Sequence, residues 1–229
     1  MVPSVDEIAA RAQTLRARIE AAAARWDRDP ASIRIVAVTK TWPVEVCRSA
    51  FAAGLAMLGE NRVQEAEPKV AALPDAEWHL VGLLQANKAR RAAAAFRTVH
   101  SVDSVRLLER LDAAAHDAGR PLRILLQVNT TDEPQKGGFA PDALAAPELS
   151  AALRAARHAT PVGLMTIARA GADARPPFAS LRRLRDELEQ RTGVSLPELS
   201  MGMSDDWEDA VAEGATLLRI GTAIFGVRG

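Results

Sequence analysis

The chain has 229 residues, of which 48% are apolar and 25% are charged, with 29 basic and 29 acidic side chains. This length suits one barrel-sized domain or two small ones, and the balanced charge argues against a nucleic-acid partner. No apolar run reaches the roughly 18 residues of a membrane span, and residues 1–26 lack the apolar stretch of a signal peptide. The only cysteine, Cys47, can form no disulfide within the chain, so we expect a cytoplasmic protein.

The predicted elements begin with an amphipathic helix over residues 4–24, in which Ser4 and Glu7 have the spacing of a capping box. After Pro30, short apolar strands alternate with helices. The strands are predicted at 33–39, 56–59, 78–82, 98–102, 122–129, 162–167, 199–202 and 217–220. The helices between and after them are predicted at 44–53, 62–72, 87–96, 104–118, 141–156 with an interruption near Pro147, 177–191, 205–212 and 222–225.

Continuous apolar strands that alternate with helices are typical of a parallel sheet covered by helices. Eight such repeats favour the α/β class and a single (β/α)8 TIM-type barrel over residues 1–229, with an extra N-terminal helix. The alternative is an open, doubly wound sheet, which would place a glycine-rich turn after its first strand. The turn at 39–43 has no glycine, so the closed barrel is preferred.

Functional groups of such barrels come from the carboxyl ends of the strands and from the loops that follow. This rule selects Lys40, Glu60, Asn61, Gln85, Asn129, Thr166, Met203, Ser204, Arg219, Gly221 and Thr222. Lys40 ends the first strand, where its amine could form a Schiff base with an aldehyde. A solvated lysine at the strand edge is the alternative interpretation.

The seventh and eighth units share one pattern, in which a strand is followed by glycine, a hydroxyl residue and a helix. Ser204 and Thr222 are the two hydroxyl residues, and each stands near the start of the helix that follows it, where a capping residue would lie. Helix starts bind phosphate, and the recurrent phosphate site of these barrels follows strands seven and eight. The segments therefore predict a phosphate site, with ordinary helix capping as the alternative.

Arg219 ends the last predicted strand, where its side chain would point into the mouth of the barrel. A guanidinium there can donate hydrogen bonds to a ring nitrogen. The alternative is an ion pair with Glu60 or Glu65.

Six segments of the chain, in order, resemble the family of pyridoxal phosphate homeostasis proteins, which are relatives of the alanine racemase N-terminal barrel. The segments read IVAVTKT, GENRVQE, WHLVGLLQANK, GLMT, LSMGMSDD and RIGTAIFG. The resemblance runs from about residue 5 to the end of the chain. It implies a protein that binds pyridoxal 5'-phosphate and is described in most relatives as a monomeric carrier without an established reaction.

The resemblance also implies a set of ligands. Lys40 is similar to the Schiff-base lysine of the family, and Arg219 to the residue that faces the pyridine nitrogen. The remaining expected cofactor residues are Ser204, Gly221 and Thr222 for the phosphate and Asn61 and Met203 in the lining of the pocket. An arginine that stays protonated disfavours a pyridinium, which makes the ring a poorer electron sink.

The chain departs from many bacterial relatives at two places. It has Trp42 where they carry a second lysine, and it ends at Arg228 and Gly229 without the lysine-bearing tail of some relatives. Lys136 matches a family lysine, although a solvated loop lysine is the favoured interpretation. These departures put a transfer route through the lysines in doubt.

Four functions are compatible with these features. The first is a carrier that stores pyridoxal phosphate or delivers it to apo-enzymes. The second is an amino-acid racemase, disfavoured because the racemase relatives use a tyrosine as second base and this chain has none. The third is a Schiff-base aldolase, whose lysine more typically lies on a later strand. The fourth, an interaction module without a ligand, would leave Lys40, Arg219 and the two expected caps unexplained.

Overall fold

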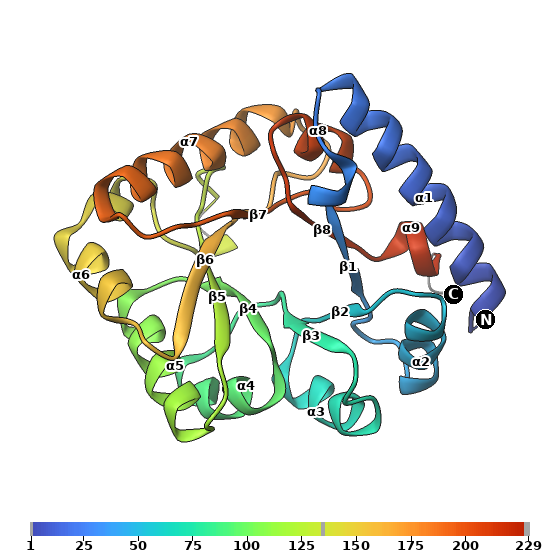
Figure 1. Ribbon diagram of the computed structural model, residues 1–229, viewed down its shortest axis with the longest axis horizontal. Helices are drawn as coiled ribbons and strands as arrows, with labels where there is room; N and C mark the ends of the chain where they lie inside the picture. Colours follow the sequence, from blue (N-terminus) through green and yellow to red (C-terminus); the bar gives the residue numbers. More distant parts are fainter. Residues whose placement is uncertain (1, 134–135, 227–229) are drawn as a thin grey trace.

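The computed structural model describes residues 2–133 and 136–226, in which eight strands form a closed barrel in the order β1 to β8. All neighbouring strands are parallel, including the closing pair β1 and β8, where Val36 lies opposite Arg219 and Ala37 opposite Ile220. The predicted α/β class and (β/α)8 barrel are therefore confirmed (Figure 1).

Each predicted strand corresponds to an observed one. The strands are β1 (Arg34–Val38), β2 (Met57–Glu60), β3 (Glu77–Leu80), β4 (Thr98–Val102), β5 (Leu122–Gln127), β6 (Ala159–Met165), β7 (Glu198–Ser200) and β8 (Leu217–Ile220). The helices are α1 (Val5–Arg25), α2 (Val44–Ala52), α3 (Val63–Ala72), α4 (Ala89–Ala95), α5 (Val105–Asp117), α6 (Pro147–Ala155), α7 (Arg175–Thr192), α8 (Trp207–Ala212) and α9 (Thr222–Phe225). Within the described ranges, none of these helices is both long and apolar enough to cross a membrane.

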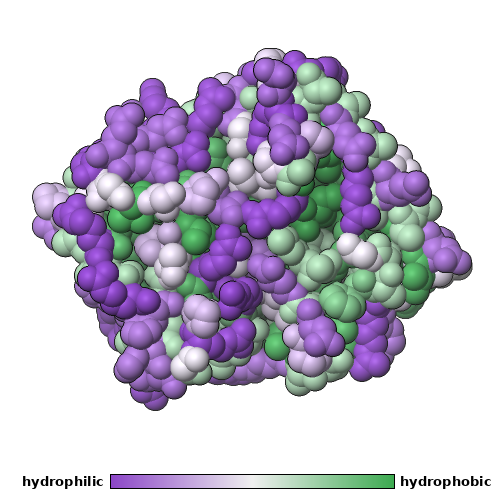
Figure 2. Space-filling model, viewed as in Figure 1, coloured by the Kyte–Doolittle hydropathy of each residue, from purple (hydrophilic) through white to green (hydrophobic). Residues whose placement is uncertain are grey.

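The extra helix α1 lies outside the repeat and packs beside α8 and α9 (Figure 1). Its start has the predicted capping box, because Ser4 Oγ accepts from Glu7 N at 3.2 Å and Glu7 Oε2 accepts from Ser4 N at 2.8 Å. Ile8, Leu15 and Ile19 form a buried stripe at helical spacing. Helices of the repeat such as α5 and α7 are also amphipathic, with buried apolar residues on one face. Figure 2 shows the hydrophilic side chains that cover the outer face of α7.

The alternation of side chains along the strands divides the buried residues into two layers. One layer lies between the strands and the helices and contains most of the core. The second fills the inside of the barrel, and its apolar members are Val36, Val38, Val81, Leu125, Val162, Met165 and Leu217. Buried polar side chains complete this inner layer, among them His79, His100, Ser200 and Arg219. An inner layer with this much polar character is unusual for a barrel of this type.

Prolines and glycines explain the main differences from the predicted boundaries. The helix expected over 141–156 is a short 3₁₀ helix at Asp142–Ala145 followed by α6, which starts at Pro147. Proline suits the first position of a helix because it has no N–H to donate. Strand β6 begins earlier than predicted, and its register with β5 shifts beside Pro161. Strand β7 ends earlier than predicted, since Gly202 turns the chain with φ of +92°.

Candidate functional site

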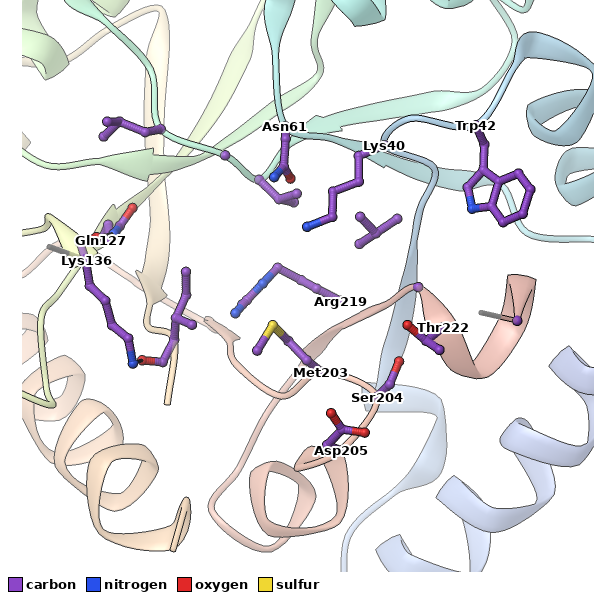
Figure 3. A pocket seen from close by; sticks show the side chains of 17 residues that line it. Lys40, Trp42, Asn61, Gln127, Lys136, Met203, Ser204, Asp205, Arg219 and Thr222 are labelled. Atoms are coloured by element: carbon purple, nitrogen blue, oxygen red, sulfur yellow. Dashed lines mark hydrogen bonds between the residues drawn. The ribbon is translucent and has the colours of Figure 1, made fainter. Parts of the chain in front are cut away.

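A cavity of about 730 Å³ opens at the carboxyl ends of the strands. All seven residues expected to contact the cofactor line it: Lys40, Asn61, Met203, Ser204, Arg219, Gly221 and Thr222. The rule of strand ends also selected Glu60, Gln85, Asn129 and Thr166, which are not among its lining residues. Figure 3 shows the side chains of Lys40 and Arg219 entering the same space. The remaining lining residues are Val38, Trp42, Val81, Gly82, Leu83, Gln127, Lys136, Ile167, Asp205 and Gly226. The barrel therefore brings together side chains from the first and last units of the sequence.

Lys40 lies in a tight turn directly after β1. The preceding Thr39 still pairs with the barrel through Thr39 N and Gly59 O at 2.8 Å, and Trp42 N donates to Thr39 O at 3.0 Å. Thr41 has a φ of +62°, a left-handed conformation that is uncommon for a residue with a branched side chain. The half-buried Lys40 is thus held by the turn with its amine in the cavity.

A buried lysine that the sequence analysis did not select supports this turn. Lys69, on α3, donates to Thr39 O at 3.1 Å, to Glu60 Oε1 at 2.8 Å and to Glu65 Oε1 at 2.9 Å. Glu60 also accepts from Thr39 Oγ1 at 2.6 Å, and Thr41 N donates to Glu65. The lysine and the two carboxylates therefore fix the backbone on both sides of Lys40.

Burial and ion pairing act against each other in this cluster. Burial raises the pKa of Glu60, against the opposing effect of Lys69 and Thr39. Burial acts to lower the pKa of Lys69, but the hydrogen bonds from its amine to Glu60 and Glu65 outweigh this and raise it. The ion-pair interpretation of Arg219 is wrong, because its guanidinium donates to Ser200 and Thr166, and the ion pairs of Glu60 and Glu65 among the described residues are with Lys69.

Ser204 and α9 form the part of the cavity in which phosphate binding was predicted. Ser204 does not cap the helix that follows it, since α8 starts only at Trp207 with Asp206 at its N-cap. Instead, Ser204 Oγ accepts from Ala223 N at 3.2 Å, in the first turn of α9. Thr222 is the first residue of α9 and Gly221 its N-cap, so the alternative interpretation of Thr222 as an ordinary cap is also wrong. A hydroxyl from the seventh unit thus caps the helix of the eighth unit.

Arg219 is almost completely buried, with 5% of its surface exposed. Its Nη1 donates to Ser200 Oγ and its Nη2 to Thr166 O, both at 2.8 Å. Burial lowers the pKa of Arg219 to about 10, so the side chain is still charged at neutral pH. A guanidinium has five N–H donors, so others remain for a ligand in the cavity.

Lys136 lines the cavity from the loop after β5. It donates to Ala168 O at 2.9 Å and to Ile167 O at 3.3 Å, and it pairs with Glu133. Its side chain is 19% exposed, so the interpretation as a solvated loop lysine is wrong. Trp42, in place of the family's second lysine, lies with its ring centroid 6.2 Å from that of Phe225. The expected chain end at 228–229 lies outside the described residues.

Asn61 and Met203 both line the cavity, as expected for them (Figure 3). Met203 is 36% exposed and Leu83 is 64% exposed, which gives the entrance an apolar side. Gln127 and Ile167 also line the cavity but were not selected from the sequence. Gln127 is the last residue of β5, so the rule of strand ends could have found it.

A closed parallel barrel with a lysine after its first strand and a buried arginine on its last, both in one cavity beside a helix start, defines a barrel of the alanine racemase N-terminal type. A model of the family described as alanine racemase, N-terminal domain, matches residues 10–229. The chain is also 44% identical over 226 residues to the pyridoxal phosphate homeostasis protein of Pseudomonas aeruginosa, covering 98% of this chain and 97% of that protein. The chain therefore belongs to the family of pyridoxal phosphate homeostasis proteins, as its resemblance to them indicated.

Solved structures agree with this assignment. The structure of PipY from Synechococcus elongatus without PLP has a TM-score of 0.85 and 44% sequence identity, and covers 96% of this chain and 100% of that chain. The structure of PipY with PLP bound has a TM-score of 0.83 and 43% identity over the same shares of both chains.

Proposed function

We propose that this protein binds pyridoxal 5'-phosphate as a Schiff base on Lys40 and stores it or delivers it to apo-enzymes without turning over a substrate. The observation that carries the proposal is that the Lys40 amine, the Arg219 guanidinium and the start of α9 share one cavity. A relative of 43% identity whose structure is described with PLP bound supports it.

The donor groups of the cavity fit this cofactor in chemical type. The Lys40 amine is the group that condenses with an aldehyde. At the start of α9 the backbone N–H of Thr222 has no intrahelical acceptor and lies beside the hydroxyls of Ser204 and Thr222, and such groups bind phosphate. Arg219 supplies a buried cation with donors to spare for a ring nitrogen.

The residues of the cavity favour binding over turnover. When bound, pyridoxal phosphate can supply electron-sink chemistry, provided that its ring nitrogen becomes protonated. Arg219 stays charged at neutral pH and can only donate hydrogen bonds. A ring nitrogen of the cofactor that accepted from Arg219 would therefore stay unprotonated. The chain also has no tyrosine that could act as a second base. Lys136, another amine in the cavity, is bound to carbonyl oxygens and to Glu133.

The proposal is tested first by binding. Purified protein titrated with pyridoxal phosphate should develop the visible absorption of a Schiff base, and borohydride should fix the adduct on Lys40 in peptide mass spectra. Lys40→Ala should abolish the adduct, and an adduct that persists in this variant would refute the lysine assignment.

A second experiment separates a carrier from a racemase. Loaded protein should restore activity to an apo-enzyme that depends on pyridoxal phosphate, and it should leave the chirality of a panel of amino acids unchanged. Racemisation at a rate well above that of free pyridoxal phosphate would favour the racemase instead.

A further inference from the structure

A line of hydrogen-bonded side chains crosses the inside of the barrel from the cavity to the opposite end. Arg219 Nη1 lies 2.8 Å from Ser200 Oγ, and Ser200 Oγ lies 2.8 Å from His100 Nδ1. His100 Nε2 lies 2.8 Å from His79 Nδ1, and His79 Nε2 lies 3.2 Å from Glu77 Oε1. The line ends at the first residue of β3, and we call these five residues the inner chain.

The surroundings of both histidines of the inner chain favour the neutral form of the rings. Each is completely buried, and burial lowers the pKa of His79 and holds that of His100 well below the usual value. Glu77 opposes this effect at His79, whereas the cations Arg34 and Arg123 add to it.

The charged groups at the base of the barrel form a cluster that adjoins Glu77. Glu198 accepts from Arg123 at 2.6 Å and also pairs with Arg34, and Arg123 lies 3.8 Å from Glu77. The carboxylate of Glu198 is thus engaged by two arginines and does not contact the histidines.

The two ends determine the position of every proton between them. Arg219 can only donate, so Ser200 Oγ accepts from it, and the ionised carboxylate of Glu77 can only accept, so His79 Nε2 carries a proton. A neutral His79 then accepts at Nδ1, which requires a proton on His100 Nε2. His100 accepts at Nδ1 in turn, and the Ser200 hydroxyl donates to it. Every bond therefore points from Arg219 towards Glu77.

We propose that the inner chain is a positioning device that holds the Arg219 guanidinium towards the cofactor ring. This inference rests on the proposed function for the role of Arg219 at the ring. Ser200 and Thr166 fix two N–H groups of Arg219. The hydrogen bond to His100 fixes the hydroxyl of Ser200, and His79 in turn fixes His100. A proton added to His79 Nδ1 would place two donors against each other, and one added to His100 Nδ1 would end the donation from the Ser200 hydroxyl, so the arrangement has one proton pattern while both rings are neutral.

The direction of the inner chain is tested without the cofactor. Nitrogen-15 spectra of the histidine rings, assigned with His79→Gln and His100→Gln, should show a proton on Nε2 and none on Nδ1 in both residues. The same pattern should persist between about pH 6 and 8, below and above the usual histidine pKa of about 6.5. A proton on Nδ1 of either ring would overturn the proposed direction.

The positioning role is tested by Ser200→Ala, which removes the link between Arg219 and His100. Arg219 must then be ordered when the cofactor binds, so the dissociation constant of pyridoxal phosphate should rise by about three- to tenfold. The absorption maximum of the bound cofactor should also move, and Ser200→Thr, which restores a hydroxyl, should reverse both changes.

Thr98→Val is the matched control, because Thr98 precedes His100 by two residues on β4 and its buried hydroxyl has no partner in the described part of the chain. This variant should bind as the wild type does. Equal affinity and equal absorption in Ser200→Ala and Thr98→Val would overturn the positioning role. A wild-type protein that binds no pyridoxal phosphate would instead refute the proposed function, and the nitrogen-15 pattern would still report on the inner chain by itself.

Discussion

The ammonium group of Lys69 lies 2.8 Å from Glu60 Oε1, and neither side chain is more than 7% exposed. The same amine reaches the backbone carbonyl of Thr39, the residue before Lys40. A buried ion pair thus lies directly beneath the turn that presents the proposed Schiff-base lysine. Its partners come from β2 and α3, so the turn is held by elements other than its own strand.

Removing this lysine should destabilise the protein strongly. In Lys69→Met the buried carboxylate of Glu60 loses its counter-ion, and we expect the free energy of unfolding at pH 7 to fall by about 3–5 kcal/mol. Urea denaturation followed by circular dichroism measures the change. Adding Glu60→Gln to Lys69→Met should recover part of the loss, and a loss below about 1 kcal/mol in the single variant would contradict the importance of the pair.

Ser204→Ala should affect both stability and cofactor binding. The variant loses the hydroxyl that accepts from Ala223 N, for which we expect a loss of about 1 kcal/mol, typical of a helix cap. Binding of pyridoxal phosphate, followed by fluorescence or absorption, should weaken as well. Ser104→Ala is the matched control, because Ser104 caps α5 through Leu107 N at 3.3 Å and does not line the cavity. Equal affinity for pyridoxal phosphate in the two variants would show that Ser204 does not contact the phosphate.

The buried histidines should make the protein less stable in mild acid. Both bind a proton in the unfolded chain below about pH 6.5, but the lowered pKa values of His79 and His100 keep them neutral in the fold. The unfolded state therefore gains protons, and stability should fall by up to about 1.4 kcal/mol per pH unit for each histidine as the pH decreases from 6.5 towards the folded pKa.

The measurement is the free energy of unfolding between pH 7.5 and 5 for the wild type and for His100→Gln. The raised pKa of Glu60 contributes in the opposite sense, because it favours proton uptake by the folded state, and it contributes equally to both proteins. The variant should therefore show the shallower loss on acidification. Parallel curves would mean that His100 takes up a proton in the folded protein.

Gly202→Ala should distort the turn that carries Met203 and Ser204. A Cβ at this position would lie 2.6 Å from Ala210 Cβ, and the φ of +92° is unfavourable for any residue except glycine. We expect a loss of stability of about 2–4 kcal/mol together with weaker cofactor binding. In Gly171→Ala the φ of +73° is similarly positive, but nothing lies within 4 Å of the added carbon. That variant should show only the smaller backbone effect and normal binding.

The parts of the site that follow from position within a barrel unit could be predicted from the sequence. Lys40 and Arg219 end apolar strands, and the carboxyl ends of all parallel strands in a barrel meet at one mouth. The two histidines could not be connected in this way. They lie 21 residues apart in the chain, without a metal-ligand spacing, and meet because β3 and β4 are neighbours and both side chains face inward.

Other features depend on contacts that no local pattern encodes. Lys69 reads as an ordinary helical lysine until the packing of α3 places its amine against Glu60. By its position in the sequence Ser204 belongs to the nearest following helix, but in the fold it accepts from α9, which begins eighteen residues later in the chain. From the sequence Lys136 has the features of a solvated loop lysine, because the carbonyl acceptors that hold it come from the loop after the next strand.

The bond between Ser204 and Ala223 has a consequence for the folding of the ring. The proposed phosphate contacts exist only when the eighth unit has closed against β1 and has also docked onto the seventh. A ligand that binds there stabilises the closed ring over any state in which the last unit is detached. Binding of the cofactor would then also hold the first and last units of the barrel together, at the position where β8 pairs with β1.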